Sequence, residues 1–382
     1  MQAHSCGEPA ADCLIIGGGL VGSAIAYGMG RRGIRVAVLD EGDVAFRASR
    51  GNFGQIWVQG KGESQPAYAA WTRASAALWP RFAAELTRRT GIGLELRHSG
   101  GFWFGYSAAE VAQRAQLLKG LGATAGIPYT MLDNAGLRAR FPLIGPAVIG
   151  GSFCPLDADV NPLLLLYALH CAIRRQGGAI YRGAAVQRIA CGDSGFSADN
   201  GQVRVAAQKI VLAAGLGNRR LAGQLGLYAP VTPLRGQVLV TERVRPLLPV
   251  TTNKLRQTAD GTVMLGSTEE AAGFDDRTSA EATSKLARRG VETFPSLAQA
   301  ALVRTWAALR VMTPDKLPIY QQSARYPGAF VATCHSAVTL AAIHAHGIAP
   351  WFAGVGPMPP LLAEGVFLAD RFSLFQEQAH GG

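Results

Sequence analysis

The residues whose types and spacing point most clearly to chemistry are three glycines, Gly17, Gly19 and Gly22, which follow an apolar run and open a stretch of small residues. In a strand–turn–helix unit, the first glycine permits the tight turn, the second lets a pyrophosphate approach the backbone, and the third lets the helix pack on the sheet. The helix N-terminus offers N–H groups and a positive dipole end to the phosphates. A second apolar run ends at Asp40, where a carboxylate can accept hydrogen bonds from ribose hydroxyls. The pattern predicts a βαβ unit that binds an adenine dinucleotide, against the alternative of a glycine-rich turn that binds nothing.

Further elements of the same kind occur in separated parts of the chain. Residues 203–215 read as a strand that ends in small residues, and residues 329–333 read as a short buried strand before a helix that opens at Ser336. Asn161 and Pro162 mark the start of another helix, because asparagine is a good N-cap and proline suits the first helical position. Strand-rich segments lie between these blocks, which favours an α/β nucleotide-binding domain interrupted by a second domain.

Composition and charge narrow the class of protein. The chain has 382 residues, of which 48% are hydrophobic and 16% charged, so it is a globular chain with a real core. The net charge of +11 could suggest nucleic acid or an anionic surface. The arginines are scattered, however, without a basic run or interleaved aromatic residues. This favours solvated helix faces over the alternatives, which are acidic substrates, an acidic protein partner or RNA.

The cysteines and the apolar runs exclude other classes. Six cysteines occur without a C-x-x-C pair, which argues against a zinc or iron–sulfur site in this chain and fits a reducing compartment. No signal-peptide pattern is apparent, and no apolar run reaches about 18 residues, the length that suggests a spanning helix. We therefore expect a cytoplasmic protein with no metal and no transmembrane segment, which partner subunits could bring to a membrane surface.

Motifs along nearly the whole chain resemble those of the D-amino-acid-oxidase-like FAD-dependent amine oxidoreductases. S-R-G-N-F-G at 49–54 is similar to the family's second flavin loop, and V-L-A-A-G at 211–215 to its A-x-G signature. L-R-V-M-T-P-D-K-L-P-I-Y at 309–320 is similar to its R-x-x-T-P-D-G-L-P-I-G motif, and residues 329–341 resemble its final flavin-binding turn. The resemblance implies an α/β fold with a Rossmann-like FAD-binding domain and an inserted mixed-sheet substrate domain. The expected bounds are 1–90, 148–225 and 306–382 for the FAD-binding domain, and 91–147 and 226–305 for the substrate domain.

The resemblance also implies which residues bind FAD. The backbone of Val186 matches a contact to adenine, and the helix that opens near Ser336 would aim its positive end at the flavin. Cys334 and Ala337 depart from the family because both positions are often glycine. Ala308 lies where monomeric sarcosine oxidases carry a flavin-linked cysteine, so we expect a non-covalent FAD. The expected cofactor-binding residues are Gly17, Gly19, Leu20, Val21, Gly22, Asp40, Glu41, Ser49, Arg50, Asn52, Val186, Ala214, Gly215, Ser336, Ala337, Val338 and Thr339.

Arg310 and His335 are the expected catalytic residues. Arg310 precedes T-P-D, where glycine-oxidising members of the family carry an arginine that binds the substrate carboxylate. The alternative is a structural arginine paired with Asp315. His335 either contacts substrate or flavin or packs the turn, and Arg235 is either a second anion clamp or, as we favour, part of an inter-strand salt bridge.

Within the family, F-G-Q-I-W-V-Q-G-K-G at 53–62 and H-S-A-V-T-L at 335–340 are most similar to the D-hydroxyproline dehydrogenase beta subunit and to the glycine-oxidising subunit of hydrogen cyanide synthase. This implies the oxidation of a small amino or imino acid by hydride transfer from Cα to flavin N5. D-hydroxyproline is the favoured substrate, followed by glycine, sarcosine or another D-amino acid.

Two other functions stay open. The chain could be the flavin-carrying subunit of a heteromeric dehydrogenase, inactive alone and passing electrons to partner subunits with their own redox centres. It could also be a tRNA-modifying flavoprotein, although no RNA-binding extension is apparent and we expect no nucleic-acid partner.

Overall fold

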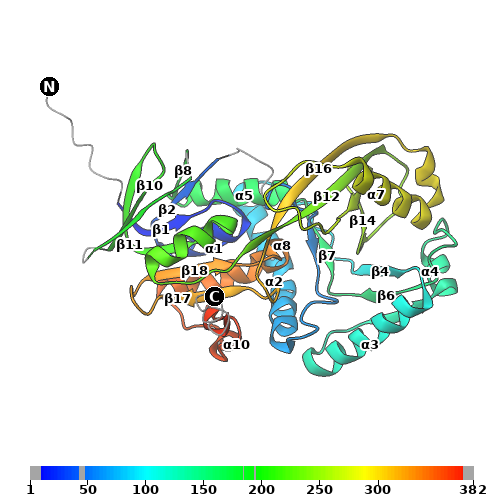
Figure 1. Ribbon diagram of the computed structural model, residues 1–382, viewed down its shortest axis with the longest axis horizontal. Coiled ribbons are helices and arrows are strands. Elements are labelled where there is room, and N and C mark those ends of the chain that lie inside the picture. Colours follow the sequence, from blue (N-terminus) through cyan, green and yellow to red (C-terminus); the bar gives the residue numbers. More distant parts are fainter. Residues whose placement is uncertain (1–9, 43–47, 184, 193–194, 373–382) are drawn as a thin grey trace, which may run out of the picture.

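The computed structural model of the chain describes residues 10–42, 48–183, 185–192 and 195–372, which form two lobes. The first lobe is built on an eight-stranded sheet and the second on two four-stranded sheets (Figure 1). Helix α2 (Pro66–Thr90) packs against helices of the first lobe and against α3 (Ala108–Ala125) of the second, so it joins the two lobes.

The large sheet has the strand order β17-β18-β11-β1-β2-β8, and the hairpin β9–β10 continues from β11. The strands from β18 to β8 are parallel, and β17 is antiparallel to β18. They come from three separated stretches of the chain, with these bounds: β1 (Ala10–Ile16), β2 (Val36–Asp40), β8 (Ala179–Arg182), β9 (Ile189–Gly192), β10 (Gly195–Asp199), β11 (Arg204–Leu212), β17 (Ile319–Gln322) and β18 (Ala329–Thr333).

Both faces of this sheet are buried, which explains why its strands read as continuous apolar runs. In β1, Cys13 and Ile15 belong to the core on the helical side, while Leu14 and Ile16 belong to the core on the opposite side. The alternation follows from the two-residue period of a strand. The helical side is covered by α1 (Leu20–Gly30), α2, α5 (Pro162–Arg175), α8 (Ala337–Ile343) and α9 (Ala349–Ala353).

Local signals set the ends of these helices. The side chain of Asn161 accepts hydrogen bonds from the backbone N–H groups of Leu163 and Leu164, each at 3.2 Å, and Pro162 occupies the first position of α5 as predicted. Helix α2 ends at Gly91, whose φ of +74° is the left-handed conformation that glycine adopts without strain.

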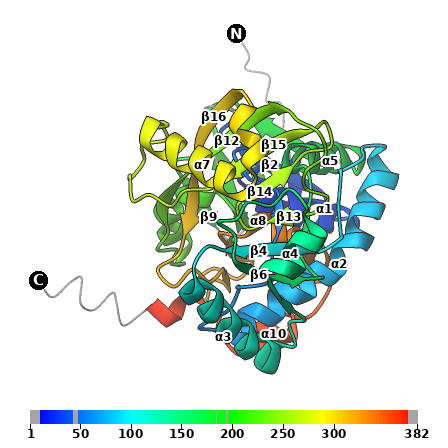
Figure 2. The ribbon, with the colours of Figure 1, turned by 90° about the vertical axis from the view of Figure 1, so that its right-hand side faces the viewer.

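The second lobe carries a core of its own, centred on Phe102, Phe104 and Phe294. One of its sheets is antiparallel throughout, and the other is mixed because β13 is parallel to β4. Figure 2 shows α3, α4 and α7 on its outer side. The bounds are β4 (Gly101–Gly105), β5 (Thr130–Asp133), β6 (Gly150–Cys154), β12 (Thr232–Arg243), β13 (Thr251–Thr252), β14 (Leu255–Gln257), β15 (Thr262–Gly266), β16 (Leu302–Met312), α4 (Asn134–Arg140) and α7 (Ala280–Thr293).

Two expected domain boundaries differ from the observed sheets. β6 lies inside the expected FAD-binding segment 148–225, yet it pairs with β4 and β5 of the second lobe. β16 extends into the expected segment 306–382, yet it pairs with β12 from Met312 to Leu302. Each strand keeps the partner that satisfies its backbone hydrogen bonds, and such long-range pairings cannot be read from a local pattern.

The packing of α1 on β1 depends on Gly22. A β-carbon at this position would lie 2.0 Å from the carbonyl oxygen of Gly17, whereas one at Gly120, in helix α3, would meet nothing within 4 Å. We expect Gly22→Ala to lower the free energy of unfolding by roughly 2 kcal/mol or more, and Gly120→Ala to raise it by up to about 1 kcal/mol. Chemical denaturation of the two variants checks this. Equal effects of both substitutions would contradict the packing described here.

Candidate functional site

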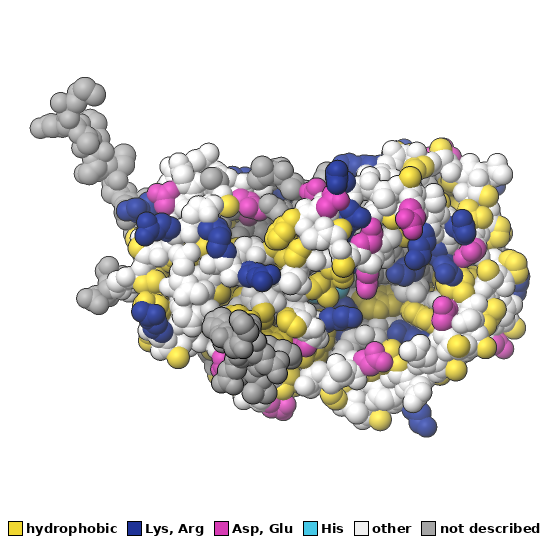
Figure 3. Space-filling model, viewed as in Figure 1, with side chains coloured by type: hydrophobic (Ala, Val, Ile, Leu, Met, Phe, Trp, Pro, Cys, Tyr) yellow, Lys and Arg dark blue, Asp and Glu magenta, His cyan; other side chains and the backbone are white. Residues whose placement is uncertain are grey.

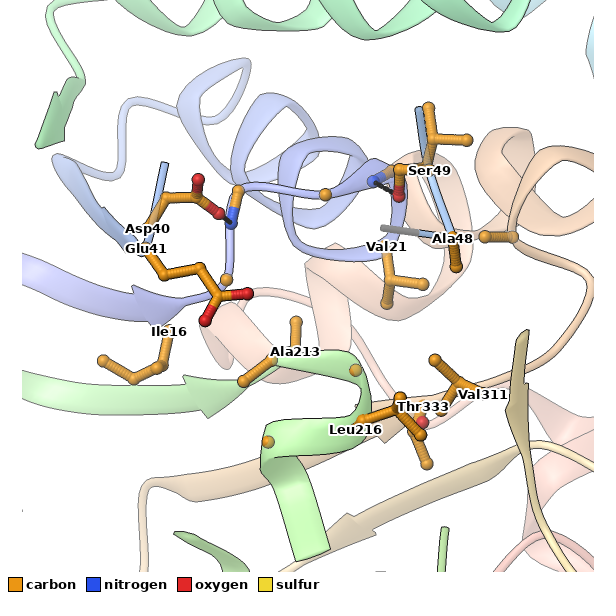
Figure 4. A pocket seen from close by; sticks show the side chains of 18 of the residues that line it. Ile16, Val21, Asp40, Glu41, Ala48, Ser49, Ala213, Leu216, Val311 and Thr333 are labelled. Carbon is orange, nitrogen blue, oxygen red and sulfur yellow. Dashed lines mark hydrogen bonds between the residues drawn. The ribbon is translucent and has the colours of Figure 1, made fainter. Parts of the chain in front are cut away.

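A cavity of about 620 Å³ opens at the carboxyl edge of the large sheet. Its walls come from the segments that follow β1, β2, β11 and β18, together with residues 48–52 (Figure 4). The chain leaves β1 toward β2 on one side, while β11 lies on the other side, so the cavity lies at the point where the strand order reverses. Open α/β sheets bind ligands at this place.

One wall of the cavity is the glycine-rich turn between β1 and α1. Gly17 has a φ of +106°, and a β-carbon there would lie 2.4 Å from the carbonyl oxygen of Ala213, so only glycine fits. The N-cap residue of helix α1, Gly19, has no side chain that could cap the helix, and the first turn has no acidic residue. Ser49 closes the turn, since its hydroxyl accepts a hydrogen bond of 2.9 Å from the backbone N–H of Leu20. The positive end of α1 therefore faces the cavity without an acidic neighbour in its first turn, which suits a pyrophosphate.

Two acidic residues mark one end of the cavity. Asp40 accepts hydrogen bonds from the backbone N–H groups of Gly18, at 2.7 Å, and Gly42, at 2.9 Å, so its carboxylate is fixed beside the turn. Figure 4 shows the Glu41 side chain reaching toward the segment that carries Ala213. Both acids line the cavity, as expected for residues that meet a ribose.

Arg220 stabilises the cavity wall that lies opposite Asp40 and Glu41. Its role was not predicted from the sequence. It donates hydrogen bonds to the carbonyl oxygens of Val186, at 2.6 Å, and Gln187, at 3.1 Å. It thereby fixes the segment in which Val186 was expected to contact adenine. The pair Arg219-Arg220 after the A-A-G turn is the signal in the sequence, and both arginines line the cavity.

Thr333, at the end of β18, lines the cavity and is 1% exposed, and its hydroxyl has no hydrogen-bond partner in the part of the chain that the structure describes. Figure 4 shows Thr333, Val311 and Leu216 among the residues that line the cavity. A buried hydroxyl without a partner is costly, so it points to a polar group of a ligand. Together with the glycine turn and the N-terminus of α1, it makes the cavity a good fit for an elongated, anionic dinucleotide.

Most of the expected site residues line this cavity. They are Gly17, Gly19, Leu20, Val21, Asp40, Glu41, Ser49, Arg50, Asn52, Val186, Ala214, Gly215, His335 and Ala337.

Five expected residues lie beside the cavity instead of in its wall: Gly22, Arg310, Ser336, Val338 and Thr339. The Ser336 hydroxyl accepts a hydrogen bond of 3.1 Å from Tyr68, and the Thr339 hydroxyl accepts one of 3.0 Å from the backbone N–H of Trp57. Val338 is buried in the helical core. These three side chains therefore face α2 and the core, and a contact between the cofactor and the backbone N–H groups of this turn stays a prediction.

Arg310 lies on β16 between Leu309 and Val311, which line the cavity. Its guanidinium donates to Ser267 and to the carbonyl oxygen of Thr268, the latter at 2.7 Å, and its buried Nη1 has no partner among the described residues. Burial lowers the pKa of Arg310 from its usual value. The guanidinium also needs Gly236 on β12, because a β-carbon there would lie 2.7 Å from it.

The alternative in which Arg310 pairs with Asp315 is wrong. Asp315 forms its ion pair with Arg371 at 2.6 Å, so it is not the partner of Arg310. Arg235 forms the salt bridge that we favoured, with Glu270 at 2.7 Å and with Asp275 at 2.9 Å. Arg310 is therefore left with its Nη1 amino group unpaired among the described residues, and a ligand could bind there.

His335 connects the cavity to a cluster of charges. Burial holds the pKa of His335 well below its ordinary value, and the positive charges of Lys61 and Arg310 lower it further. The imidazole is therefore neutral near pH 7. Lys61 and the exposed Glu269, which acts on both Lys61 and Arg310, were not expected from the sequence. The only signal for Lys61 in the sequence is the Q-G-K-G run at 59–62. The residues that act on Lys61 are distant in the chain.

Within the described ranges, no group of three or more His, Cys, Asp or Glu side chains could hold a metal ion. The same part of the chain has no helix with both the length and the apolar character needed to span a bilayer.

Comparisons with known proteins agree with this geometry. The family model described as DAO, FAD dependent oxidoreductase, matches residues 12–351. One opine oxidase subunit, from Rhizobium meliloti, is 40% identical over 370 residues, which cover 96% of this chain and 99% of that protein. Hydrogen cyanide synthase subunit HcnC of Pseudomonas aeruginosa is 29% identical and covers 85% of this chain and 87% of its own length. The crystal structure of glycine oxidase from Geobacillus kaustophilus superposes with a TM-score of 0.86 at 27% identity, covering 94% of this chain and 99% of that one.

The unpaired hydroxyl of Thr333 provides a test of the cavity. Thr333→Val keeps the shape and removes only the hydroxyl, so we expect the cofactor-free protein to keep its stability and the Kd for FAD to rise about 5- to 10-fold. Fluorescence quenching of added FAD measures the affinity, and thermal unfolding without FAD provides the control. An unchanged affinity would show that this hydroxyl does not contact the cofactor.

Proposed function

The chain belongs to the DAO family of FAD-dependent oxidoreductases, and on this premise we propose that it oxidises a carboxylated amine, with opines as the first substrate class. An opine is a secondary amine whose nitrogen joins two carbon chains that bear carboxylates. Two relatives that are named as opine oxidase subunits, at 40% and 41% identity over nearly their whole length, support opines above the other candidates. Glycine, sarcosine and D-hydroxyproline follow as smaller alternatives.

The observation that carries this proposal is the buried Nη1 of Arg310, which has no partner among the described residues. Arg310 lies beside the cavity, and its charge acts on His335, which lines the cavity. An N–H group of a guanidinium forms a charge-assisted hydrogen bond with a carboxylate. Ser267 and Thr268 hold Nη2 of Arg310, so little freedom is lost when the substrate binds.

Oxidation of such an amine removes a hydride from Cα and a proton from nitrogen, and leaves an imine that water hydrolyses. FAD, when bound, supplies the acceptor for the hydride. We propose that it is held without a covalent bond by the glycine turn, Asp40, Glu41 and the 213–221 segment. Arg310 would bind the carboxylate and orient the Cα–H bond. His335, neutral at physiological pH, would present a polar group there without adding a further positive charge.

A specific observation favours a second, compatible role within a heteromeric enzyme. The relatives from opine oxidase and from hydrogen cyanide synthase are both named as subunits. We propose that this chain oxidises the amine and passes the electrons to a partner protein. The tRNA-modifying alternative stays a prediction that a filter-binding assay with tRNA would test.

Replacement of Arg310 tests the carboxylate clamp. We expect Arg310→Met to raise the substrate concentration for half-maximal anaerobic bleaching of the flavin at least about 10-fold, because a charge-assisted hydrogen bond is lost. Its FAD content should stay unchanged. The substrates tested are an opine, glycine, sarcosine and both enantiomers of hydroxyproline. Arg245→Met, at an exposed position, is the control. Equal concentration dependence in both variants would remove Arg310 from the site.

The choice of electron acceptor tests the heteromeric role. We expect the purified, FAD-loaded chain to reduce an artificial dye in the presence of substrate and to react slowly with oxygen. Dye reduction and hydrogen peroxide release measure the two rates separately. Rapid peroxide release at the rate of dye reduction would show a self-sufficient oxidase instead.

A further inference from the structure

The segment that follows β3 (Gln55–Ile56) is fixed beside helix α8, whose N-terminal turn reaches the cavity. The backbone N–H of Trp57 donates to the hydroxyl of Thr339 at 3.0 Å. The fully buried Asp157 accepts hydrogen bonds from the backbone N–H of Val58, at 2.6 Å, and from the side-chain amide of Gln59, at 2.6 Å. These bonds hold the segment rigidly against the end of the cavity where His335 lies.

Lys61 follows in this segment, between two glycines that leave no room for side chains. Gly60 has a φ of +85°, and a β-carbon there would lie 2.8 Å from the guanidinium of Arg114. Gly62 has a φ of +76°, and its β-carbon would lie 2.4 Å from the backbone nitrogen of Ala69. Arg114 is itself held by the side-chain oxygen of Gln59, at 2.6 Å. The backbone on both sides of Lys61 is therefore fixed, which limits where its side chain can reach.

The charged groups around Lys61 come from two other parts of the chain. Arg310 and Lys316 in one part, and Glu269 in the other, act on its amine electrostatically, and Lys61 in turn acts on His335. The thiol of Cys334 also lies near, but burial raises its pKa to about 12, so it is neutral. Burial, with the nearby charge of Arg310, lowers the pKa of Lys61 to about 8. Lys61 and Arg310 therefore both lie near His335, which lines the cavity, while neither of the two is part of the cavity wall. Figure 3 shows Lys and Arg side chains around a hollow with a hydrophobic floor, between the two lobes.

The ammonium of Lys61 has no hydrogen bond and no ion pair with any described residue. The neighbouring Lys254, by contrast, donates to the carbonyl oxygen of Ser267 at 3.2 Å. Glu269 is exposed and forms no ion pair within the described ranges. Two cationic groups that share a partly buried site are unfavourable until an anion joins them.

We propose that Lys61 binds a second carboxylate of the substrate while Arg310 binds the first, so that the site selects secondary amines with two carboxylates over amines with one. The inference rests on the proposed function, since it assigns the substrate class of the same site. A dicarboxylate would match the two cations, whereas glycine or sarcosine would leave Lys61 without a counter-ion.

The reaction that follows from this substrate class is balanced. The substrate loses a hydride from the carbon between one carboxylate and the nitrogen, and a proton from the nitrogen, to form a carbon–nitrogen double bond. The two electrons would leave with the hydride, for which bound FAD would be the acceptor. Water then adds to the imine, and the carbon–nitrogen bond breaks to give a 2-oxo acid and a primary amino acid. Lys61 would take no part in bond breaking and acts as a residue that determines specificity.

Binding of inert carboxylates tests this without relying on turnover. Oxydiacetate replaces the nitrogen of the simplest dicarboxylated secondary amine by oxygen, so it cannot form an imine, and methoxyacetate is its analogue with one carboxylate. Each is titrated into FAD-loaded protein while the flavin absorbance spectrum is followed. For the wild type we expect oxydiacetate to bind at least about 10-fold tighter than methoxyacetate.

Lys61→Met should remove this preference by weakening oxydiacetate alone, and Lys61→Arg should keep most of it. Lys119→Met, an exposed lysine of α3, is the control for charge loss. FAD content and thermal unfolding show whether each variant is folded, and Lys61→Gln replaces the methionine variant if that one is not.

A Lys61→Met protein that retains the preference, or a wild type that has none, would overturn the proposal. The proposed function fails in a different way. In that case no opine or amino acid bleaches the flavin, although oxydiacetate still binds through Lys61.

Discussion

The close approach of backbone to backbone at the end of β1 is the constraint on which the site depends. Gly17 lies against Ala213, and Gly22 lies against Gly17, at distances that exclude a β-carbon. Because no side chain intervenes, α1 begins directly at the carboxyl edge of the sheet and turns its N-terminus toward the cavity. Asp40 and Ser49 then fix the turn through backbone N–H groups. The direction of the whole cofactor cavity follows from this one turn.

The opposite end of the cavity depends on how the two lobes meet. Arg310 comes from the long β12–β16 ladder of the second lobe, where Gly236 leaves room for its guanidinium. Lys61 comes from a segment that is tied to the first lobe through Thr339. A substrate held by both would therefore join the two lobes beside the flavin site. This arrangement gives the second lobe a function beyond covering the cofactor.

The parts of the site that depend on local sequence could be predicted. The glycine turn, Asp40, Ser49 and the Asn161 cap are positions where one residue type is required by nearby backbone. The FAD family also followed from motifs spread along the chain, and the family match confirms it.

What could not be predicted depends on distant partners. Asp315 was considered as the partner of Arg310, but it pairs with Arg371, 56 positions away. Val338 and Thr339 follow a motif residue, yet α8 buries them in the core. Lys61 has no signature because its role depends on Arg310 and His335, which no local pattern brings together. The pairing of β6 and β16 with strands of the second lobe could not be predicted for the same reason.

A crystal structure of the FAD-loaded chain soaked with oxydiacetate is the most direct test of this account. The account predicts the adenosine portion between Asp40 and Val186, the flavin ring beside His335, and one carboxylate on Arg310 with the other on Lys61. A flavin ring at the Asp40 end, or carboxylates that contact neither cation, would contradict it.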